Sequence, residues 1–311
     1  MPRLFGTNGV RGVVGESMTA QFALDVGRAI GSCKDPCDFV VGTDARTSAH
    51  MLKYAVSSGL QSCGHRVFDA GIVPTPALQY CIKNGRAHMG VVITASHNPP
   101  QFNGIKVISG DGTEMSREEE VPIEEVFFSK TYKQVPWNKT GTVQEISGIA
   151  ESYVKGVLSQ IDIAAIKGAK LDVAIDCANG AGSYTGPLIL ENLCRKVISL
   201  NCHFSGKFPG HPSEPTEENL RDLQILVRES NLDAGIAMDG DADRAIFFDE
   251  KGNFVTGEKI LALLAKKAVD GTGGIVVTPV ATSSLVEDVV SSSGGKVEYT
   301  RVGAPIVARR M

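Results

Sequence analysis

The apolar and polar residues of this chain follow two periods, and the two periods alternate along its length. Residues 38–44 (DFVVGTD) form a short β-branched run, which predicts a buried strand. Residues 48–64 then place apolar side chains at helical spacing, which predicts a helix, and residues 66–71 predict the next strand. Glycine and small hydroxyl residues lie between these segments, as expected for turns. This alternation is typical of an α/β fold.

The same order of elements recurs twice further along the chain. Residues 171–182 repeat the apolar strand and glycine turn, and a helix, a strand, a helix and the strand 233–241 come next. A third round begins near Gly257 with a helix, the strand-like stretch 273–284, a second helix and the strand-like stretch 296–303. Repetition of one supersecondary unit indicates related domains rather than one large core.

A polar stretch, residues 129–148, is the best candidate for a linker. We therefore predict three related α/β domains, each a mixed sheet sandwiched by helices, over residues 1–148, 149–252 and 253–311. The third domain holds one helix–strand–helix–strand round, so we expect it to be incomplete within these 311 residues.

Composition narrows the class of protein. Of the 311 residues 42% are hydrophobic and 21% are charged, and the formal net charge of −4 provides no general basic field for nucleic acid. No apolar run reaches membrane-spanning length, and the N-terminus lacks an apolar signal region. The seven cysteines include no C-x-x-C pair, which is typical of reduced, buried thiols. We expect a cytoplasmic protein without a membrane or nucleic-acid partner.

Three alternating aspartates are the most specific chemical feature of the chain. In MDGDADRAIFFDE (238–250), Asp239, Asp241 and Asp243 follow an apolar strand, and their period-two spacing places the three carboxylates on one side of the backbone. Like charges so close together need a cation, and a hard divalent metal is the simplest candidate. Magnesium beside a phosphate fits best, with Arg244 as a clamp on that phosphate.

Two alternatives for this cluster stay open. A calcium EF-hand loop also has ligands at its first, third and fifth positions, but its sixth position requires glycine, and Arg244 stands there. Residues 245–248 (AIFF) are also typical of a strand rather than of a ligand loop. A solvated acidic turn without a metal is the second alternative.

The stretch GVVITASHNPPQFNGIK (90–106) ends a β-branched run with Ser96 and His97. Ser, Asn and Pro are ordinary turn formers, so a surface turn is one interpretation. The other is that the strand delivers Ser96 to a reaction. Three aspartates more than neutralise a dication, and a phosphoryl group on Ser96 would supply a further oxygen ligand at a site suited to phosphoryl transfer.

Several motifs, in the same order along the chain, resemble those of the α-D-phosphohexomutases. They are FGTNGVRG (5–12), TASHNP (94–99), DGDADR (239–244) and the looser TRVG (300–303). The resemblance covers essentially the whole chain and is greatest to the archaeal phosphomannomutase and phosphoglucosamine mutase branch. It implies an enzyme that moves a phosphoryl group between C6 and C1 of a hexose phosphate, with glucosamine or mannose phosphate favoured, through a phosphoserine and a 1,6-bisphosphate intermediate.

The resemblance also implies roles for individual positions. Ser96 would carry the phosphoryl group in the resting enzyme, and a hexose 1,6-bisphosphate would act as activator. Asp239, Asp241 and Asp243 would hold Mg²⁺ together with the phosphate of Ser96. The other implied site residues are Lys106 as general acid/base, Arg11 as stabiliser of the transferred charge, His97 as a catalytic neighbour of the serine, Arg244 on the phosphoserine, and Arg301 and Gly303 on the sugar.

Some of these residues also have a purely structural interpretation. His97 could hold the serine loop by a hydrogen bond, Lys106 could be a solvated edge lysine, and Arg11 could brace a glycine-rich turn. The stretch 208–220 is expected to be a loop followed by a helix with Thr216 as its N-cap, and no chemistry is assigned to it.

The chain departs from the family pattern near residue 311. Ala304 stands where the family carries Asp or His, and neither the third-domain GE-x-S/N-G sugar loop nor the fourth-domain Arg-Ser-Gly-Thr phosphate segment occurs in this sequence. We therefore expect a polypeptide of these residues to be impaired in full turnover. A truncated, non-catalytic paralogue that binds sugar phosphate or a partner chain is the alternative, and a metal-dependent phosphatase with an aspartate nucleophile is a weaker one. The identity of the hexose and a homodimeric state stay open.

Overall fold

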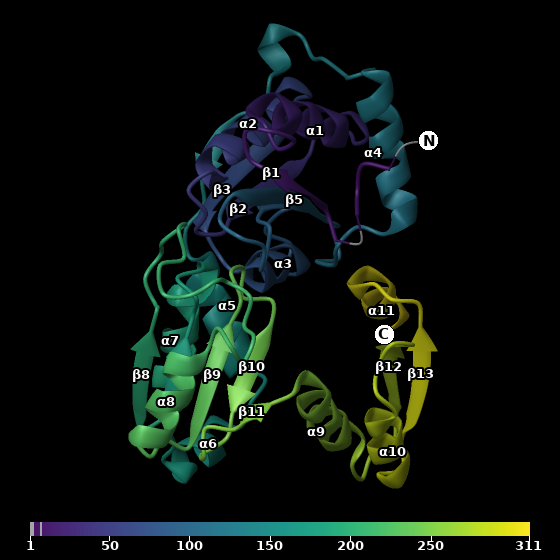
Figure 1. The fold of residues 1–311 in the computed structure, drawn as a ribbon. Helices are drawn as coiled ribbons and strands as arrows, with labels where there is room; N and C mark the ends of the chain where they lie inside the picture. The colour runs from purple at the N-terminus through teal and green to yellow at the C-terminus, as the bar shows by residue number, and fades with distance from the viewer. Residues whose placement is uncertain (1–2, 7) are drawn as a thin grey trace.

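The computed structural model describes residues 3–6 and 8–311, so Thr7 of the FGTNGVRG motif lies outside the described residues. Three sheets of decreasing size follow one another along the chain, and helices pack against each of them (Figure 1). The predicted fold of three α/β units is therefore confirmed. Within the described part of the chain, no helix is long and apolar enough to cross a lipid bilayer.

The first sheet has six strands in the order β1-β5-β4-β2-β3-β6. Strand β2 is parallel to β3 and β4, and β3 is parallel to β6, whereas β5 is antiparallel to both of its neighbours. Helices α1, α2 and α4 share one apolar core with this sheet, and α3 and α5 share a second core on its other face. The bounds are β1 (Val10–Val13), α1 (Ala20–Ser32), β2 (Asp38–Thr43), α2 (Ala49–Ser62), β3 (Arg66–Ile72), α3 (Thr75–Lys83), β4 (Met89–Ile93), β5 (Phe102–Ile108), α4 (Arg117–Ser129), β6 (Val143–Glu145) and α5 (Ile149–Leu158).

Residues 129–148, expected to be a linker, are partly structured. They include the 3-10 turn η1 (Trp137–Lys139) and strand β6, which pairs with β3 at the edge of the first sheet. All three residues of β6 are exposed, so their sequence lacks the apolar alternation that reveals a half-buried strand. The pairing ties the segment before α5 to the first sheet.

The second sheet has the order β11-β10-β9-β7-β8. Strands β8, β7 and β9 are parallel, and β9, β10 and β11 are antiparallel. Helix α8 packs Leu223 and Val227 against Ala174 and Phe248 of the sheet. The bounds are α6 (Ile163–Ala169), β7 (Asp172–Asp176), η2 (Ala181–Ser183), α7 (Thr185–Glu191), β8 (Lys196–Leu200), α8 (Arg221–Glu229), β9 (Ala234–Met238), β10 (Ala245–Phe248) and β11 (Phe254–Val255).

The predicted N-cap of α8 is wrong. The helix begins at Arg221, and Thr216 instead closes a turn, with its Oγ1 accepting from the backbone N–H of Asn219 at 3.4 Å. The side-chain amide of Asn219 donates to the carbonyl of Glu214 at 2.8 Å. These local bonds keep the segment in turns and bury Leu220 before the helix starts.

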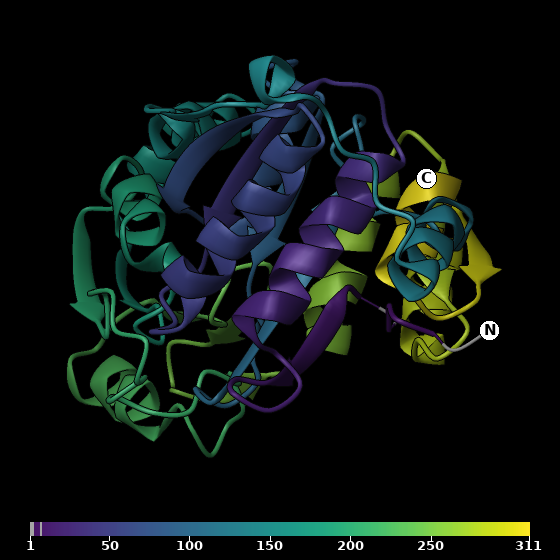
Figure 2. The same ribbon diagram turned by 90° about the horizontal axis from the view of Figure 1, so that it is seen from above.

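The third sheet has two parallel strands, and helices α9 and α10 form a small core with it. Helix α11 follows the second strand and lies beside the first domain in both views (Figures 1 and 2). There Arg309 pairs with Glu119 and lies 3.9 Å from a carboxylate oxygen of Asp111. The bounds are α9 (Gly257–Val269), β12 (Ile275–Pro279), α10 (Ser284–Ser292), β13 (Lys296–Thr300) and α11 (Ala304–Arg310).

Candidate active site between the first two domains

Ser96 has an uncommon backbone conformation. Strand β4 ends at Ile93, and Ser96 adopts a φ of +51°, in the left-handed region that residues other than glycine rarely occupy. Such a conformation costs roughly 1–3 kcal/mol and persists only where the surroundings enforce it. Thr94 contributes, because its Oγ1 accepts the Ser96 N–H at 2.9 Å.

Arg46 supplies most of this enforcement. Its side chain is fully buried, and its Nε lies 2.9 Å from Oδ2 of Asp44. The guanidinium also donates to four backbone carbonyls of the serine loop, those of Ser96, Asn98, Pro99 and Phe102. Hydrogen bonds from a charged donor are stronger than neutral ones, so together these contacts hold the loop in one conformation.

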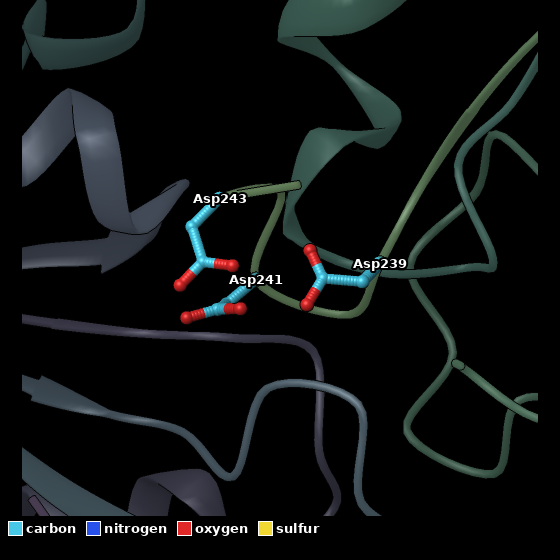
Figure 3. Close-up of side chains that lie close together, drawn as sticks. All are labelled: Asp239, Asp241 and Asp243. Carbon is cyan, nitrogen blue, oxygen red and sulfur yellow. The ribbon is translucent and has the colours of Figure 1, made fainter. Parts of the chain in front are cut away.

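The three aspartates lie on the loop between β9 and β10, and their carboxylates point toward one another (Figure 3). One oxygen atom from each carboxylate lies within 4.8 Å of the others. Asp239 and Asp241 are buried, and Asp243 is exposed. The loop also touches the serine backbone: a Cβ atom at Gly240 would lie 2.5 Å from the carbonyl oxygen of Ser96, so only glycine allows this approach.

Hydrogen bonds join the aspartate loop to three elements of the first domain. Ser96 Oγ donates to Oδ2 of Asp239 at 2.7 Å. Thr75 Oγ1, at the start of α3, donates to Oδ2 of Asp241 at 2.6 Å. Lys106 Nζ, on β5, donates to the same Oδ2 of Asp241 at 2.9 Å and to Oδ2 of Asp243 at 3.0 Å. The structure therefore brings Ser96, Lys106 and the three aspartates together.

The electrostatics of the cluster follow from burial and from the crowding of like charges. Burial and the neighbouring carboxylates of Asp241 and Asp243 raise the pKa of Asp239 to about 7. Burial alone would lower the pKa of Lys106, but the carboxylates of Asp241, Asp243 and Glu114 outweigh it and raise that pKa above its ordinary value. The raised pKa favours the ammonium form of Lys106, which donates hydrogen bonds to Asp241 and Asp243.

The donor set of the cluster fits a divalent metal. The ammonium of Lys106 and the guanidinium of Arg244 do not fully balance three carboxylates, and hard oxygen ligands suit Mg²⁺. The buried Oδ1 of Asp241 has no hydrogen-bond partner among the described residues. An unpaired buried acceptor costs about 1–3 kcal/mol, and a cation at this oxygen would remove that cost.

A cavity of about 510 Å³ lies beside this cluster. Arg11 holds its place there by donating from Nη1 to Oδ1 of Asn98 at 2.7 Å. The lining includes Arg11, Thr75, Ser96, His97, Asp243 and Arg244 from the first two domains, and Ala304, Pro305 and Ala308 from α11.

The predicted sugar-binding residues Arg301 and Gly303 lie elsewhere. Both line a neighbouring cavity of about 290 Å³, together with Arg117. Ala304, the position that departs from the family pattern, lines the cavity of about 510 Å³ beside the aspartates, called the main cavity below. The structure does not place Arg301 or Gly303 in the lining of this main cavity.

Three residues of the site escape sequence analysis. Arg46 follows the buried strand β2 in GTDAR, where a charged Asp-x-Arg pair next to a strand end is a usable signal. Thr75 carries no signal beyond its place at a helix start. Glu214 accepts from Nη1 of Arg244 at 3.0 Å, but it lies in the 208–220 loop, where no motif points to chemistry.

Known proteins resemble this chain over nearly its whole length. The family models described as "Phosphoglucomutase/phosphomannomutase, alpha/beta/alpha domain" I, II and III match residues 2–134, 151–252 and 256–311. A phosphoglucomutase/phosphomannomutase of Thermococcus kodakarensis is 44% identical, over 100% of this chain and 69% of the relative. A phosphopentomutase of the same organism is also 44% identical, over 97% of this chain and 66% of the relative.

Two further matches cover the chain to the same extent. A phosphoglucosamine/phosphogalactosamine mutase of Sulfurisphaera tokodaii is 40% identical, over 100% of this chain and 70% of the relative. The crystal structure of a phosphoglucomutase/phosphomannomutase family protein from Burkholderia thailandensis is 25% identical with a TM-score of 0.85, over 99% of this chain and 68% of that chain. Such relatives indicate an intramolecular phosphotransferase of the isomerase class. The chain therefore belongs to the phosphoglucomutase/phosphomannomutase family, the α-D-phosphohexomutases.

Proposed function

We propose that this phosphohexomutase moves a phosphoryl group between C6 and C1 of a hexose phosphate by way of a phosphoserine at Ser96. The contact of 2.7 Å between Ser96 Oγ and Oδ2 of Asp239 carries the proposal. A constrained serine hydroxyl thereby stands beside three carboxylates that fit a metal and beside a cavity lined by arginines, as covalent phosphoryl transfer requires. Relatives named phosphomannomutase and phosphoglucosamine mutase support mannose or glucosamine phosphate as the substrate.

Asp239, Asp241 and Asp243 would hold Mg²⁺, together with an oxygen of phosphorylated Ser96. When bound, the metal offsets the charge of the phosphoryl group and polarises it for transfer. Arg11 lines the same cavity as Ser96 and offsets the charge that develops during transfer, and Arg244 holds the phosphoserine side.

The serine and the sugar each exchange a proton during transfer. When the bisphosphate recharges the enzyme, the bond from Ser96 Oγ to phosphorus forms as the bond from phosphorus to the sugar oxygen breaks. His97 Nδ1, 3.3 Å from Ser96 Oγ, takes the serine proton once the hydroxyl turns toward it from Asp239, and the ammonium of Lys106 gives a proton to the sugar oxygen. For Arg301 and Gly303 to meet the sugar, residues 300–303 have to approach the main cavity from the neighbouring one.

We further propose that residues 1–148, 149–252 and 253–311 are the three domains. Ser96, Lys106 and the aspartates belong to the first two, so a polypeptide of residues 1–311 would keep serine phosphorylation and be reduced in full turnover. A non-catalytic paralogue that binds sugar phosphate would keep neither.

Phosphopeptide mapping of the purified chain tests the proposal. We expect incubation with glucose 1,6-bisphosphate and Mg²⁺ to add one phosphoryl group to the Ser96 peptide and none to the Ser96→Ala variant. Ser58→Ala, which removes an exposed serine of α2, should label like the unmodified chain. An unlabelled Ser96 would overturn the proposal, and a phosphoryl group on an aspartate, which unlike phosphoserine hydrolyses readily in acid, would support the phosphatase alternative.

A substrate panel tests the sugar. It compares glucosamine, mannose and glucose 6-phosphates with ribose 5-phosphate, because the phosphopentomutase relative is as similar as the phosphomannomutase relative. Ser96 could be labelled faster by the pentose bisphosphate, and turnover could be faster with the pentose phosphate. That result would contradict a hexose as the substrate but would leave the proposed phosphoserine chemistry in place.

A further inference from the structure

A closed ring of polar contacts surrounds the Ser96 hydroxyl, and Glu214 closes it. Starting from Ser96, Oγ lies 3.3 Å from Nδ1 of His97, and Nε2 of His97 lies 3.4 Å from Oε2 of Glu214. Glu214 binds Arg244, whose Nη2 donates to Oδ2 of Asp239 at 3.2 Å. Ser96 Oγ donates to the same Oδ2, which completes the ring. Glu214 is the one member that neither the sequence motifs nor the proposed mechanism uses.

The carboxylate of Glu214 contacts both of its neighbours at once. Its two oxygens accept from the two terminal nitrogens of Arg244, Oε1 at 3.0 Å and Oε2 at 3.4 Å, which is a fork-to-fork pair. The second oxygen also faces the His97 ring. An ionised carboxylate only accepts hydrogen bonds, so the His97 nitrogen that faces it carries a proton. The other ring nitrogen of His97 is then an acceptor that faces Ser96 Oγ, and the single hydroxyl proton, which Asp239 accepts in this structure, can turn toward it.

The backbone of Glu214 is fixed against the serine loop. Its carbonyl accepts from the backbone N–H of Thr216 at 2.9 Å and from the amide of Asn219 at 2.8 Å. The preceding residue, Ser213, is buried and donates to the carbonyl of Asn98 on the serine loop at 3.3 Å. A side chain on such a support can orient its partners with little loss of conformational entropy.

We propose that Glu214 is a positioning residue that fixes the guanidinium of Arg244 and the ring of His97 around the Ser96 hydroxyl. The inference rests on the proposed phosphoserine function. Arg244 has a long, flexible side chain that is 40% exposed. Without the carboxylate of Glu214 it would pair only with Asp239 and Asp243. A misplacement of about 1 Å at a reacting group typically costs about a hundredfold in rate.

Three substitutions separate positioning by charge from simple packing. Glu214→Asp keeps two charged oxygens on a shorter side chain, Glu214→Gln keeps the shape without the charge, and Glu214→Ala removes both. The readout is the maximum rate at which Ser96 is phosphorylated by glucose 1,6-bisphosphate and Mg²⁺. We expect the Gln and Ala variants to lose about ten- to a hundredfold and the Asp variant to lose less than either. A packing role gives the opposite order, with Gln close to the unmodified chain and Asp impaired.

Two controls complete the experiment. Glu217→Gln removes the same charge from an exposed side chain three residues away and should leave the rate unchanged. In an Arg244→Ala background, Glu214→Ala should add less than it does alone, because only its contact with His97 is still to be lost. Full additivity there, or a Gln variant as fast as the unmodified chain, would overturn the inference. Failure of the unmodified chain to become phosphorylated would instead overturn the proposed function.

Discussion

Lys106 and Asp241 form a buried ion pair within the aspartate cluster, with Nζ 2.9 Å from Oδ2. The same carboxylate leaves its other oxygen without a hydrogen-bond partner among the described residues. The ammonium thus supplies part of the positive charge that the cluster needs, and a bound dication has to share the carboxylates with it.

Removal of this ammonium should strengthen metal binding. We expect Lys106→Met to bind Mn²⁺ or Mg²⁺ about tenfold more tightly, since two like charges a few ångströms apart repel by up to about 4 kcal/mol near a protein surface. Isothermal titration calorimetry at about pH 8, above the raised pKa of Asp239, measures this. Lys251→Met, at an exposed site, is the matched control. Asp241→Asn should lose most of the affinity, and unchanged binding in that variant would contradict the metal assignment.

Arg46 should be a major determinant of stability. Arg46→Met leaves Asp44 as a buried, unpaired carboxylate and frees the carbonyls of the serine loop, so we expect a loss of about 3–5 kcal/mol in the free energy of unfolding. Urea denaturation measures it, with the exposed Arg221→Met as control. A loss below about 1 kcal/mol, the level of a surface substitution, would show that the loop does not depend on the guanidinium.

The backbones of the first two domains approach each other closely at Gly206. A Cβ atom at this position would lie 2.2 Å from the backbone nitrogen of Thr47, so Gly206→Ala must separate the two loops. We expect a loss of about 1–3 kcal/mol in stability, as for other overpacked sites, together with slower phosphorylation of Ser96. Thermal unfolding and phosphopeptide mapping measure these effects. Gly168→Ala, with open space at the same atom, should change neither, and equal behaviour of the two variants would contradict the close approach.

His211 should stabilise the second domain at acidic pH. Its Nε2 faces Oδ1 of Asp176 at 3.1 Å and its Nδ1 faces the carbonyl of Pro212 at 2.7 Å, so the doubly protonated ring satisfies both acceptors. Burial alone would lower the pKa of His211, but Asp176 outweighs it and raises that pKa.

The sign of the pH effect follows from that shift. The stabilisation is complete below the unfolded pKa of about 6.5 and is lost as the pH rises through the higher folded value. His211→Gln should therefore destabilise the protein more at about pH 5.5 than at about pH 9. Thermal unfolding at both pH values tests this, with the exposed His50→Gln as control. A loss of stability in His211→Gln that grows toward alkaline pH would contradict the role of protonated His211.

Local patterns reveal the fold and half of the site. Thr19 shows why: it precedes an amphipathic stretch and its Oγ1 accepts from the backbone N–H of Phe22, so both the start and the buried face of α1 follow from neighbouring residues. Ser96 and Asp239 are recognisable in the same way, since each ends a strongly apolar strand. Strand β6 cannot be recognised from its sequence, because its residues are exposed. The start of α8 cannot be recognised either, because side-chain hydrogen bonds within the preceding turn set it.

The supporting residues depend on contacts that no local pattern contains. Arg46 donates to the carbonyl of Ser96 fifty residues away, and Glu214 accepts from Arg244 across thirty residues, a helix and a strand. Each contact forms only after two loops that are far apart in the sequence of one domain have met. The position of Arg301 likewise depends on how the third sheet is placed relative to the first domain, and the TRVG motif alone does not determine that placement.

Thr75 binds Asp241 twice, by its hydroxyl at 2.6 Å and by its backbone N–H to the Asp241 carbonyl at 3.0 Å. Separation of the first two domains would break these bonds and the buried ones from Ser96 to Asp239 and from Lys106 to Asp241. Helix α11 is held to the first domain by exposed arginine–carboxylate pairs, which contribute about 0–1 kcal/mol each. On the proposed function, displacement of α11 would therefore be the least costly route for substrate exchange, and Ser96 and the three aspartates would stay assembled meanwhile.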